Sequence, residues 1–456
     1  MSKAVKIGVI GAGSATFSLA LVHDLILTEG LHGSTVTFMD IDADRLAFIH
    51  RLAQRYVEET GVDLRFERTL DRKAALTDAD FVINTALIGG HPAEEAERQF
   101  VDERGYYRGL RPLHMQRQLG FMLDVARDVE RICPDAWLIQ SSNPVFEGCT
   151  LMTRQTGVKV VGLCHGFRGY RKIARVLGLN PEEVEWQAPG LNHVVYLTHF
   201  RFRGEDAYPI LNDWIAHNAE AYWATEADWK FGDNDMARAA IDHYQRVGLM
   251  PLGDTPRAFT TWWYHTDLET KRHWFGAPVG GFDSEIGWRQ YLDRLQTRLD
   301  TIAHAVRDEG TPITESLPLT HSGEIQLSLM DSLANDVQRI LQVNVPNNGA
   351  IAGIPDDVVV EGKAVVSGMG VQLLQVGKLP ESLMMQIILP RWLLMERELS
   401  AYVNHDYHLL RDIVLEDHRT QSREQADALL NEWLAMPANA DLAAWYGQRV
   451  RVASPV

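Results

Sequence analysis

The feature that most constrains the fold is an alternation, over about the first 180 residues, of short β-branched runs with longer amphipathic stretches. Apolar residues in the longer stretches recur every three or four positions, as on one face of a helix. Such an alternation predicts a parallel sheet covered by helices on both faces. The predicted strands are Val5–Ile10, Val36–Met39, Phe81–Thr85, Ala136–Ile139 and Val158–Leu163, and the helices include Ser18–Thr28, Ala43–Thr60 and Gln118–Ile132.

The rhythm changes after about residue 185. Trp, Tyr and His cluster between 186 and 275, and long helical patterns dominate from 285 onward. Leu383–Val403 and Ser422–Leu434 have the apolar spacing of packed helices, and part of them could equally form an oligomer interface. We therefore predict a doubly wound, Rossmann-like α/β domain over 1–185 and a mixed α+β, largely helical domain over 186–456.

Composition excludes several classes of protein. The 44 Lys and Arg residues are outnumbered by 61 Asp and Glu, giving a net charge of -17, so a nucleic-acid partner is not expected. Charged residues interrupt every apolar run before the ~18 residues that a membrane span needs. Three cysteines and an N-terminus without an apolar targeting core predict a soluble protein of the reducing cytoplasm.

A glycine-rich turn follows the first predicted strand. Gly11 and Gly13 precede an apolar helix, an arrangement that lets backbone N–H groups approach a pyrophosphate, although Thr16 replaces the third glycine of the usual motif. Asp40 ends the second strand, where a carboxylate binds an adenosine ribose hydroxyl and disfavours a 2′-phosphate. The pair predicts NAD as cofactor, with a purely structural turn as the alternative. Asp42 is expected to cap the following helix.

Two polar clusters follow apolar segments further along the chain. Cys164 and His165 stand at the end of a predicted strand, where ligands of open α/β sheets bind. Asn192 and His193 follow 28 and 29 residues after Cys164. A thiolate and an imidazole could form half of the ligand shell of a divalent metal, or Cys164 and His193 could be ordinary core residues.

Two further segments could bind substrate. Asn143, after the strand at 136–139, could hold a hydroxyl group or simply initiate a turn with Pro144. The loop that carries Asp254 and Arg257 precedes an aromatic run over 262–265 that suits a sugar ring and a protein core equally well. Asp254 is either a general base or a helix cap.

These motifs occur together, in this order, in glycoside hydrolase family 4, the NAD-dependent glycosidases, and the chain resembles that family over nearly its whole length, most of all its α-glucosidase and α-galactosidase branch. The stretches that carry the resemblance are Ile10–Ser14, Phe38–Asp42, Phe81–Thr85, Gly105–Gly109, Ser142–Pro144, Cys164–Gly166, Gly190–His193, Gly253–Thr255, Asp267–Thr270, Asp283–Trp288 and Asn344–Asn347.

The resemblance implies roles for individual residues. Gly11, Gly13, Ser14 and Asp40 would belong to the NAD site, and Cys164 and His193 would be ligands of Mn²⁺ or another divalent metal. Asn143, His165 and Asn192 would surround the sugar, and Asp254 would be the catalytic base of an enzyme for α-linked substrates. Residues 1–185 would then bind NAD, and 186–456 would contribute substrate and metal binding and form a homodimer or homotetramer.

The chemistry that the resemblance implies is an elimination. Transient oxidation of the sugar at C3 by NAD⁺ acidifies the C2 hydrogen, a base removes it, and the metal stabilises the enediolate while the aglycone leaves C1. Water then adds, and proton and hydride return, so the cofactor is not consumed. The family is an exception to the scheme with two catalytic carboxylates.

The chain departs from the α-glucosidase pattern at Arg111, near the predicted sugar site. An arginine there could bind the carboxylate of a uronide, or it could face solvent or a carboxylate of the protein. Arg257 is a second candidate for substrate binding. Two other functions stay open: a dehydrogenase of the malate or lactate type, and a noncatalytic regulator that senses NAD.

Overall fold

The computed structural model describes residues 3–225, 235–257 and 261–447, with the side chains of Ala15 and Arg111 also outside the description. Its centre is a parallel sheet with strand order β3-β2-β1-β4-β5-β6. The strands are β1 (Lys6–Ile10), β2 (Thr35–Met39), β3 (Arg65–Thr69), β4 (Phe81–Asn84), β5 (Trp137–Gln140) and β6 (Lys159–Gly162). The predicted Rossmann-like arrangement is confirmed. The prediction omitted β3, whose charged residues hide its strand pattern.

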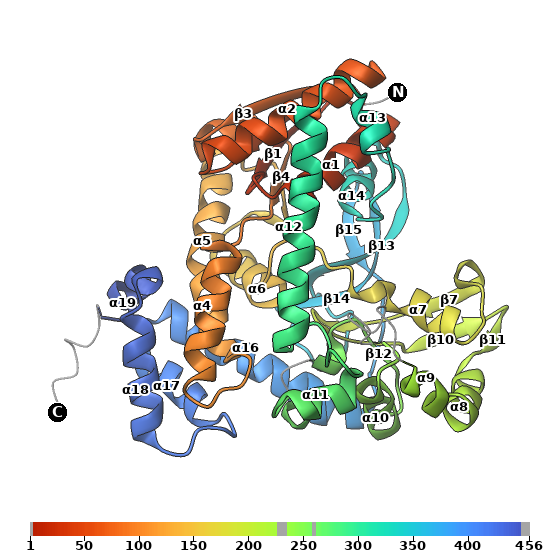
Figure 1. The fold of residues 1–456 in the computed structure, drawn as a ribbon, viewed down its shortest axis with the longest axis vertical. Coiled ribbons are helices and arrows are strands. Elements are labelled where there is room, and N and C mark those ends of the chain that lie inside the picture. The colour runs from red at the N-terminus through yellow and green to blue at the C-terminus, as the bar shows by residue number, and fades with distance from the viewer. Residues whose placement is uncertain (1–2, 226–234, 258–260, 448–456) are drawn as a thin grey trace.

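Helices cover both faces of this sheet (Figure 1). Val9 points into a core with the buried faces of α1, α2, α12 and α14, whereas the next residue, Ile10, points into a core with α3, α5 and α6. This is the alternation expected of a strand buried on both sides. The helices are α1 (Ala15–Leu27), α2 (Ala43–Thr60), α3 (Arg72–Leu76), α4 (Gly90–Asp102), α5 (Arg111–Ile132), α6 (Val145–Gln155), α12 (Glu285–Arg307) and α14 (Gln326–Asn335).

The sheet continues across the predicted domain boundary. Antiparallel strands extend it past β6 in the order β13, β14, β8, β9 and β12, and β15 pairs with β14. Asn344 of β13 pairs with Gly162 of β6, and Glu361 of β14 pairs with Gly190 of β8. These strands are β8 (Gly190–Leu191), β9 (Val194–Tyr196), β12 (Pro251–Leu252), β13 (Arg339–Pro346), β14 (Val359–Ser367) and β15 (Gly370–Leu373).

Two further regions flank the sheet in Figure 1. One holds a three-stranded antiparallel sheet of β7 (Val184–Gln187), β10 (His199–Phe202) and β11 (Glu205–Asp206), with α7 (Gly169–Val176), α8 (Tyr208–His217), α9 (Ala219–Ala224), α10 (Arg238–Val247) and α11 (Leu268–Phe275) nearby. The other is the C-terminal group of α16 (Leu389–Val403), α17 (Tyr407–Leu415), α18 (Arg423–Leu434) and α19 (Ala440–Gly447). Short helical segments are η1 (Glu29–Leu31), η2 (Gly166–Arg168), η3 (Pro181–Glu183), η5 (Thr255–Arg257), η6 (Trp262–Tyr264), α13 (Ile313–Ser316), α15 (Glu381–Leu383), η7 (Met384–Ile388) and η8 (Pro437–Asn439). The largely helical second half is confirmed.

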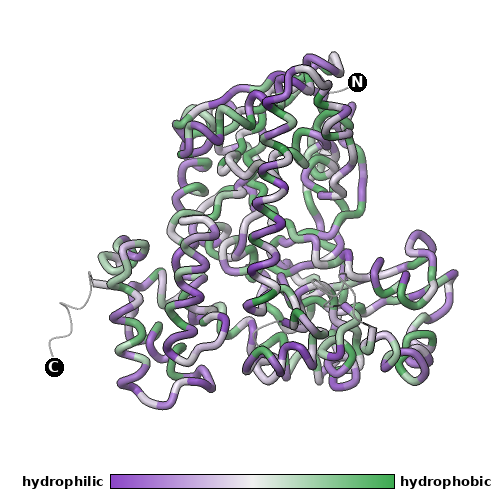
Figure 2. The backbone as a smooth tube through the Cα atoms, viewed as in Figure 1, coloured by the Kyte–Doolittle hydropathy of each residue, from purple (hydrophilic) through white to green (hydrophobic). Residues whose placement is uncertain are grey.

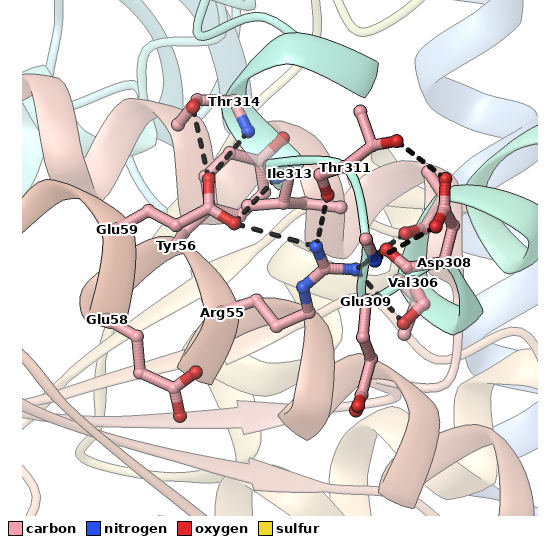
Figure 3. Close-up of polar contacts among 12 residues, drawn as sticks. Arg55, Tyr56, Glu58, Glu59, Val306, Asp308, Glu309, Thr311, Ile313 and Thr314 are labelled. Carbon is pink, nitrogen blue, oxygen red and sulfur yellow. Dashed lines mark hydrogen bonds and ion pairs between the residues drawn. The ribbon is translucent and has the colours of Figure 1, made fainter.

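The long helix α12 is anchored at its C-terminal end to α2 (Figure 3). The buried guanidinium of Arg55 donates to the carbonyl oxygens of Ala305 (2.7 Å) and Asp308 (2.8 Å), which the end of a helix leaves without partners. Glu59 accepts from the backbone N–H groups of Ile313 (2.6 Å) and Thr314 (2.9 Å). In Figure 2 α12 carries both hydrophilic and hydrophobic stretches, as expected of a helix that covers a core with one face. Within the described residues, every helix is too short or too polar to cross a membrane.

Candidate active site

A cavity of about 2080 Å³ opens at the carboxyl ends of the parallel strands, and it unites nearly all candidate residues. Its walls include Gly11, Gly13, Ser14, Asp40, Asn143, Cys164, His165, Asn192, His193, Asp254 and Arg257. Sites for drug-sized ligands measure about 300–1,000 Å³, so this cavity has room for two ligands side by side. The remaining candidate, the side chain of Arg111 at the first residue of α5, lies outside the described residues.

The glycine-rich turn is shaped by close backbone contacts. Gly11 adopts φ +86°, and a Cβ atom there would lie 2.6 Å from the backbone nitrogen of Ala86, so no other residue fits. Gly13 donates its N–H to Oδ2 of Asp40 at 2.7 Å. The carboxylate of Asp40 is therefore fixed against the turn, at the edge of the cavity. Ser14 is the exposed N-cap of α1.

The side chain of Asp42 caps α2, as predicted. It accepts from the backbone N–H groups of Asp44 and Arg45, two donors that the start of a helix leaves without partners. Asp40 and Asp42 thus differ in role, since only Asp42 accepts hydrogen bonds from the first N–H groups of α2.

Cys164 and His193 reach the cavity from different strands. Cys164 follows β6 and is half-buried, and its Sγ accepts the N–H of Gly166 at 3.5 Å. Burial raises the pKa of this thiol, as do the nearby carboxylates of Glu361 and Asp254. His193 lies in the two-residue turn between β8 and β9 at φ +63°, a left-handed conformation uncommon outside glycine.

Asp254 is the centre of the charged groups here. One carboxylate oxygen contacts the guanidinium of Arg257, and the other lies 3.7 Å from Nε2 of His193. Burial alone would raise the pKa of Asp254, but the charges of Arg257 and His193 outweigh burial and lower it to about 2. Asp254 is therefore ionised at neutral pH and able to accept a proton. The backbone carbonyl oxygen of Asp254 also accepts the backbone N–H of Arg257 at 2.8 Å.

The predicted sugar-binding residues differ in their surroundings. Asn143 follows β5 and is exposed to the cavity. The side chain of His165 is 74% exposed and lies 3.6 Å from Glu324. Asn192 is instead buried, and its Nδ2 donates to Oε2 of Glu361 at 3.0 Å. Asn192 thus presents the rest of its amide in a fixed orientation.

The aromatic run divides between the cavity and the core. Trp262 is 45% exposed, lines the cavity and stacks on His418 with ring centres 4.1 Å apart. Tyr264 is fully buried and packs against Phe275. The core interpretation therefore holds for Tyr264, and binding of a sugar ring by Trp262 stays a prediction.

Several polar residues that line the cavity or, like Glu361, lie buried behind its wall were assigned no role from the sequence. Glu361 had a signal, because it is a lone acid in the apolar stretch 358–366. Asp283 begins one of the stretches that carry the family resemblance, but no role was assigned to it. Arg98 and Lys271 had no signal, since charged residues in amphipathic helices usually face solvent. Lys271 is nevertheless fully buried.

Comparison with known families decides the class of protein. The model of the family 4 glycosyl hydrolases matches residues 6–179, and that of the C-terminal domain of the same family matches residues 188–420. The chain belongs to family 4 of the glycosyl hydrolases. It is thus a glycosidase, and the dehydrogenase and regulator readings are set aside.

Relatives within this family act on different sugars. The chain is 27% identical to an α-galactosidase of Bacillus subtilis over 83% of this chain and 85% of the relative. It is 26% identical to an α-galacturonidase of Thermoanaerobacterium saccharolyticum over 94% and 95% of the two chains. A 6-phospho-α-glucosidase from gut microorganisms, solved in complex with NAD and Mn²⁺, has the same fold, with a TM-score of 0.75, 18% identity and coverage of 95% and 98%.

Proposed function

We propose that this family 4 glycosyl hydrolase is an α-glycosidase that depends on NAD and a divalent metal and cleaves its substrate by transient oxidation and elimination. The observation that carries the proposal is the single cavity that joins the glycine-rich turn and Asp40 to Cys164, His193 and Asp254. The substrate is an α-glucoside, an α-galactoside or an α-uronide.

The turn after β1 fits a dinucleotide. A Cβ atom at Gly13 would lie 2.7 Å from the Asp40 carboxylate, so glycine lets the turn and Asp40 lie against each other. Gly11 and Gly13 also leave bare backbone that a phosphate can approach. The N-terminus of α1 adds oriented N–H donors, and Asp40 is placed to accept from a ribose hydroxyl. When bound, NAD⁺ would supply a reversible hydride acceptor for C3 of the sugar.

Cys164 and His193 fit a metal that takes its other ligands from the substrate. They offer one thiol and one imidazole to the cavity, and the described residues contain no group of three acid, His or Cys side chains arranged for a metal. When bound, Mn²⁺ would act as a Lewis acid on the C2 and C3 oxygens. The oxygen ligands of a sugar suit manganese, whereas the thiol alone would favour zinc.

The chain's own groups move the proton and orient the sugar. Asp254 takes the proton from C2 and returns it, and Arg257 keeps this base ionised. Asn143, His165 and Asn192 bind sugar hydroxyl groups, and Glu361 holds Asn192 in place. A homodimer or homotetramer in the cytoplasm remains part of the proposal.

The decisive experiment is hydrolysis of p-nitrophenyl α-glycosides with NAD⁺, Mn²⁺ and a thiol reductant, with the β-anomers as matched controls. We expect nitrophenol release from α-anomers without net NADH, and deuterium at C2 of the product sugar formed in D₂O. Cleavage of β-anomers alone would contradict the α assignment. Active enzyme that incorporates no deuterium would contradict elimination with a base open to solvent.

A further inference from the structure

A group of buried and partly buried cations lines the cavity close to Asp254, and we call it the basic cluster. It comprises Arg98 of α4, Arg108 from the loop before α5, Arg257 of η5 and Lys271 of α11. Arg98 and Arg108 lie near each other in the sequence, as do Arg257 and Lys271, but the two pairs are far apart. The fold therefore brings the four cations together, and no short sequence motif predicts the cluster.

One carboxylate, Asp283, lies in the middle of the cluster. Its Oδ1 is 2.8 Å from Nζ of Lys271 and 3.7 Å from Nη1 of Arg257. Arg108 donates through Nε to the backbone carbonyl oxygen of Asp283 at 3.2 Å. Asp283 is also the strongest electrostatic partner of Arg98. The carboxylate of Asp283 is thus shared by Lys271 and Arg257, and it is also a counter-charge for Arg98.

The other nearby acids are already engaged. Asp254 pairs with Arg257, and Asp102 pairs with Arg108 at 3.2 Å. Glu94 faces the imidazoles of His91 (2.9 Å) and His114 (3.6 Å). Glu285 accepts from the hydroxyl of Tyr107 at 2.7 Å.

Arg98 is left without an ion pair among the described residues. Its guanidinium stacks on the ring of Trp288 at 4.2 Å. Its electrostatic neighbours include the carboxylates of Asp283 and Glu94, which Lys271 and two histidines also engage. They also include two further cations, Arg108 and Arg257. A guanidinium beside two others is unfavourable unless an anion joins them.

Buried donors of the cluster also lack acceptors. Nη1 of Arg98, Nη2 of Arg108 and Nε of Arg257 are shielded from solvent and have no hydrogen-bond partner among the described residues. Nε1 of Trp288 and Nε2 of His265 share this condition on the same cavity wall. Buried donors cost free energy without acceptors, and here the acceptors can come from a ligand.

We propose that the basic cluster is a subsite for an oxyanion carried by the glycone, so that the enzyme selects an acidic sugar, either a uronide or a sugar phosphate, over a neutral one. The inference rests on the proposed function. The glycone is the part of the substrate placed here, because Arg257 contacts both Asp283 and Asp254, the base that works on the sugar ring. Planar guanidinium groups bind the oxygens of a carboxylate or phosphate in pairs, which a hydroxyl cannot match.

The test compares p-nitrophenyl α-glycosides that differ only at C6. The pairs are α-glucoside with α-glucuronide and α-galactoside with α-galacturonide, and the 6-phosphates form a third arm. We expect kcat/KM for an acidic member to exceed that of its neutral partner by about 10²-fold or more. Preference for uronides or for 6-phosphates identifies the source of the oxyanion. Equal or better cleavage of the neutral sugars would overturn the subsite and leave the proposed function intact. Absence of cleavage in every arm would instead count against the proposed function.

Substitutions in the basic cluster test whether it is the source of the preference for acidic sugars. Arg98→Met keeps bulk against Trp288 and removes the charge, so kcat/KM for the acidic sugar should fall about 10-fold or more while kcat/KM for the neutral sugar changes less than about 3-fold. Arg104→Met is the matched control, because Arg104 follows α4, is partly exposed and pairs with Glu432 outside the cavity. If Arg98→Met fails to fold, protection of the wild-type holoenzyme against heat by free glucuronate, but not by glucose, replaces it. Equal losses for both sugars, or equal protection by both ligands, would overturn the proposal.

Discussion

The amide of Asn192 donates to the carboxylate of Glu361 at 3.0 Å, and both side chains are buried beneath the cavity. Glu361 lies on a row across the sheet, paired with Asn344 on one side and Gly190 on the other. The row joins the predicted sugar-binding turn to the parallel strands. Burial raises the pKa of Glu361 to about 7, against the opposing effect of hydrogen bonds from Asn192 and Gln342.

Two replacements of Glu361 should separate the effect of its negative charge from the effect of its hydrogen bond to Asn192. Glu361→Gln retains an oxygen that accepts from Asn192, so we expect kcat/KM within about 10-fold of wild type. Glu361→Leu leaves the Asn192 amide without an acceptor, which costs about 1–3 kcal/mol of stability and lowers kcat/KM further. Urea unfolding and kinetics on both variants measure this. Identical behaviour of the Leu and Gln variants would refute the positioning role.

The carboxylate of Asp254 should govern an unusually acidic limb of the pH profile. Its pKa is held near 2, so the base stays ionised in wild type down to pH 3. Arg257→Gln removes the charge that lowers this pKa, so the pKa rises and kcat/KM should begin to fall at a higher pH. Arg257→Lys keeps the charge and serves as control. Asp254→Asn should lower kcat by about 10²–10⁴-fold at every pH. An acidic limb that stays in place in Arg257→Gln would show that Arg257 does not tune the base.

Asp40 should make NAD⁺ the preferred dinucleotide. Its carboxylate is fixed by the N–H of Gly13, where it would repel the 2′-phosphate of NADP⁺. Fluorescence titration should give a Kd for NAD⁺ at least about 10-fold below that for NADP⁺, and Asp40→Ser should reduce the gap. The control is Asp44→Ser, at an exposed position in the first turn of α2. Equal affinities in wild type would rule out this role of Asp40.

Stability should fall on the acid side because of His243. This imidazole is fully buried, contacts the hydroxyl of Tyr196 at 3.0 Å, and has a pKa lowered by burial and by Arg246 to about 4, against 6.5 in an exposed group. Between pH 6.5 and 4 the unfolded chain binds a proton that the folded chain does not, so the free energy of unfolding falls as pH falls. The loss is about 2 kcal/mol at pH 5. His243→Gln should flatten the pH dependence of urea unfolding, whereas His408→Gln, at an exposed site, should not.

The ion pair between Arg391 of α16 and Glu147 of α6 is almost fully buried, and Glu398 lies 4.0 Å from the same guanidinium. Arg391→Met would remove a buried positive charge that contacts both carboxylates, and we expect a loss of about 3–5 kcal/mol in the free energy of unfolding. Arg397→Met, on the same helix but paired with Glu416 at the surface, should cost less than about 1 kcal/mol. Equal losses in the two variants would contradict the prediction.

The sequence predicted the bounds of a helix well where residues at both of its ends mark its start and its stop. The helix Ala43–Thr60 was predicted at its observed bounds because Asp42 caps its start, Gly61 ends it at φ +67°, and its apolar period is regular. The helix predicted from Gln118 begins at Arg111, because the apolar side chains of its first turns face the C-terminal helices, which lie far away in the sequence.

Long-range pairing was out of reach of sequence reasoning. Nothing local indicates that Asn344 pairs with Gly162, because the register depends on two segments more than 180 residues apart. The same holds for the basic cluster, whose members look like surface charges one at a time. By contrast, the residues of the glycine-rich turn and Asp254 were identifiable, since each belongs to a short motif next to a strand.

Helix α12 covers the core with one face, and its length also sets the distance between the contacts at its two ends. At its start, Glu285 accepts a hydrogen bond from Tyr107, next to Asp283. At its end, the carbonyl oxygen of Ala305 accepts from Arg55 of α2, the helix that begins just after Asp40. A helix of 23 residues spans about 35 Å, and one added residue would advance it by about 1.5 Å and rotate it by about 100°. The protein can therefore exchange amino acids along α12 far more easily than it can gain or lose one, because a change in number would shift Glu285 and Asp283 relative to α2 and Asp40.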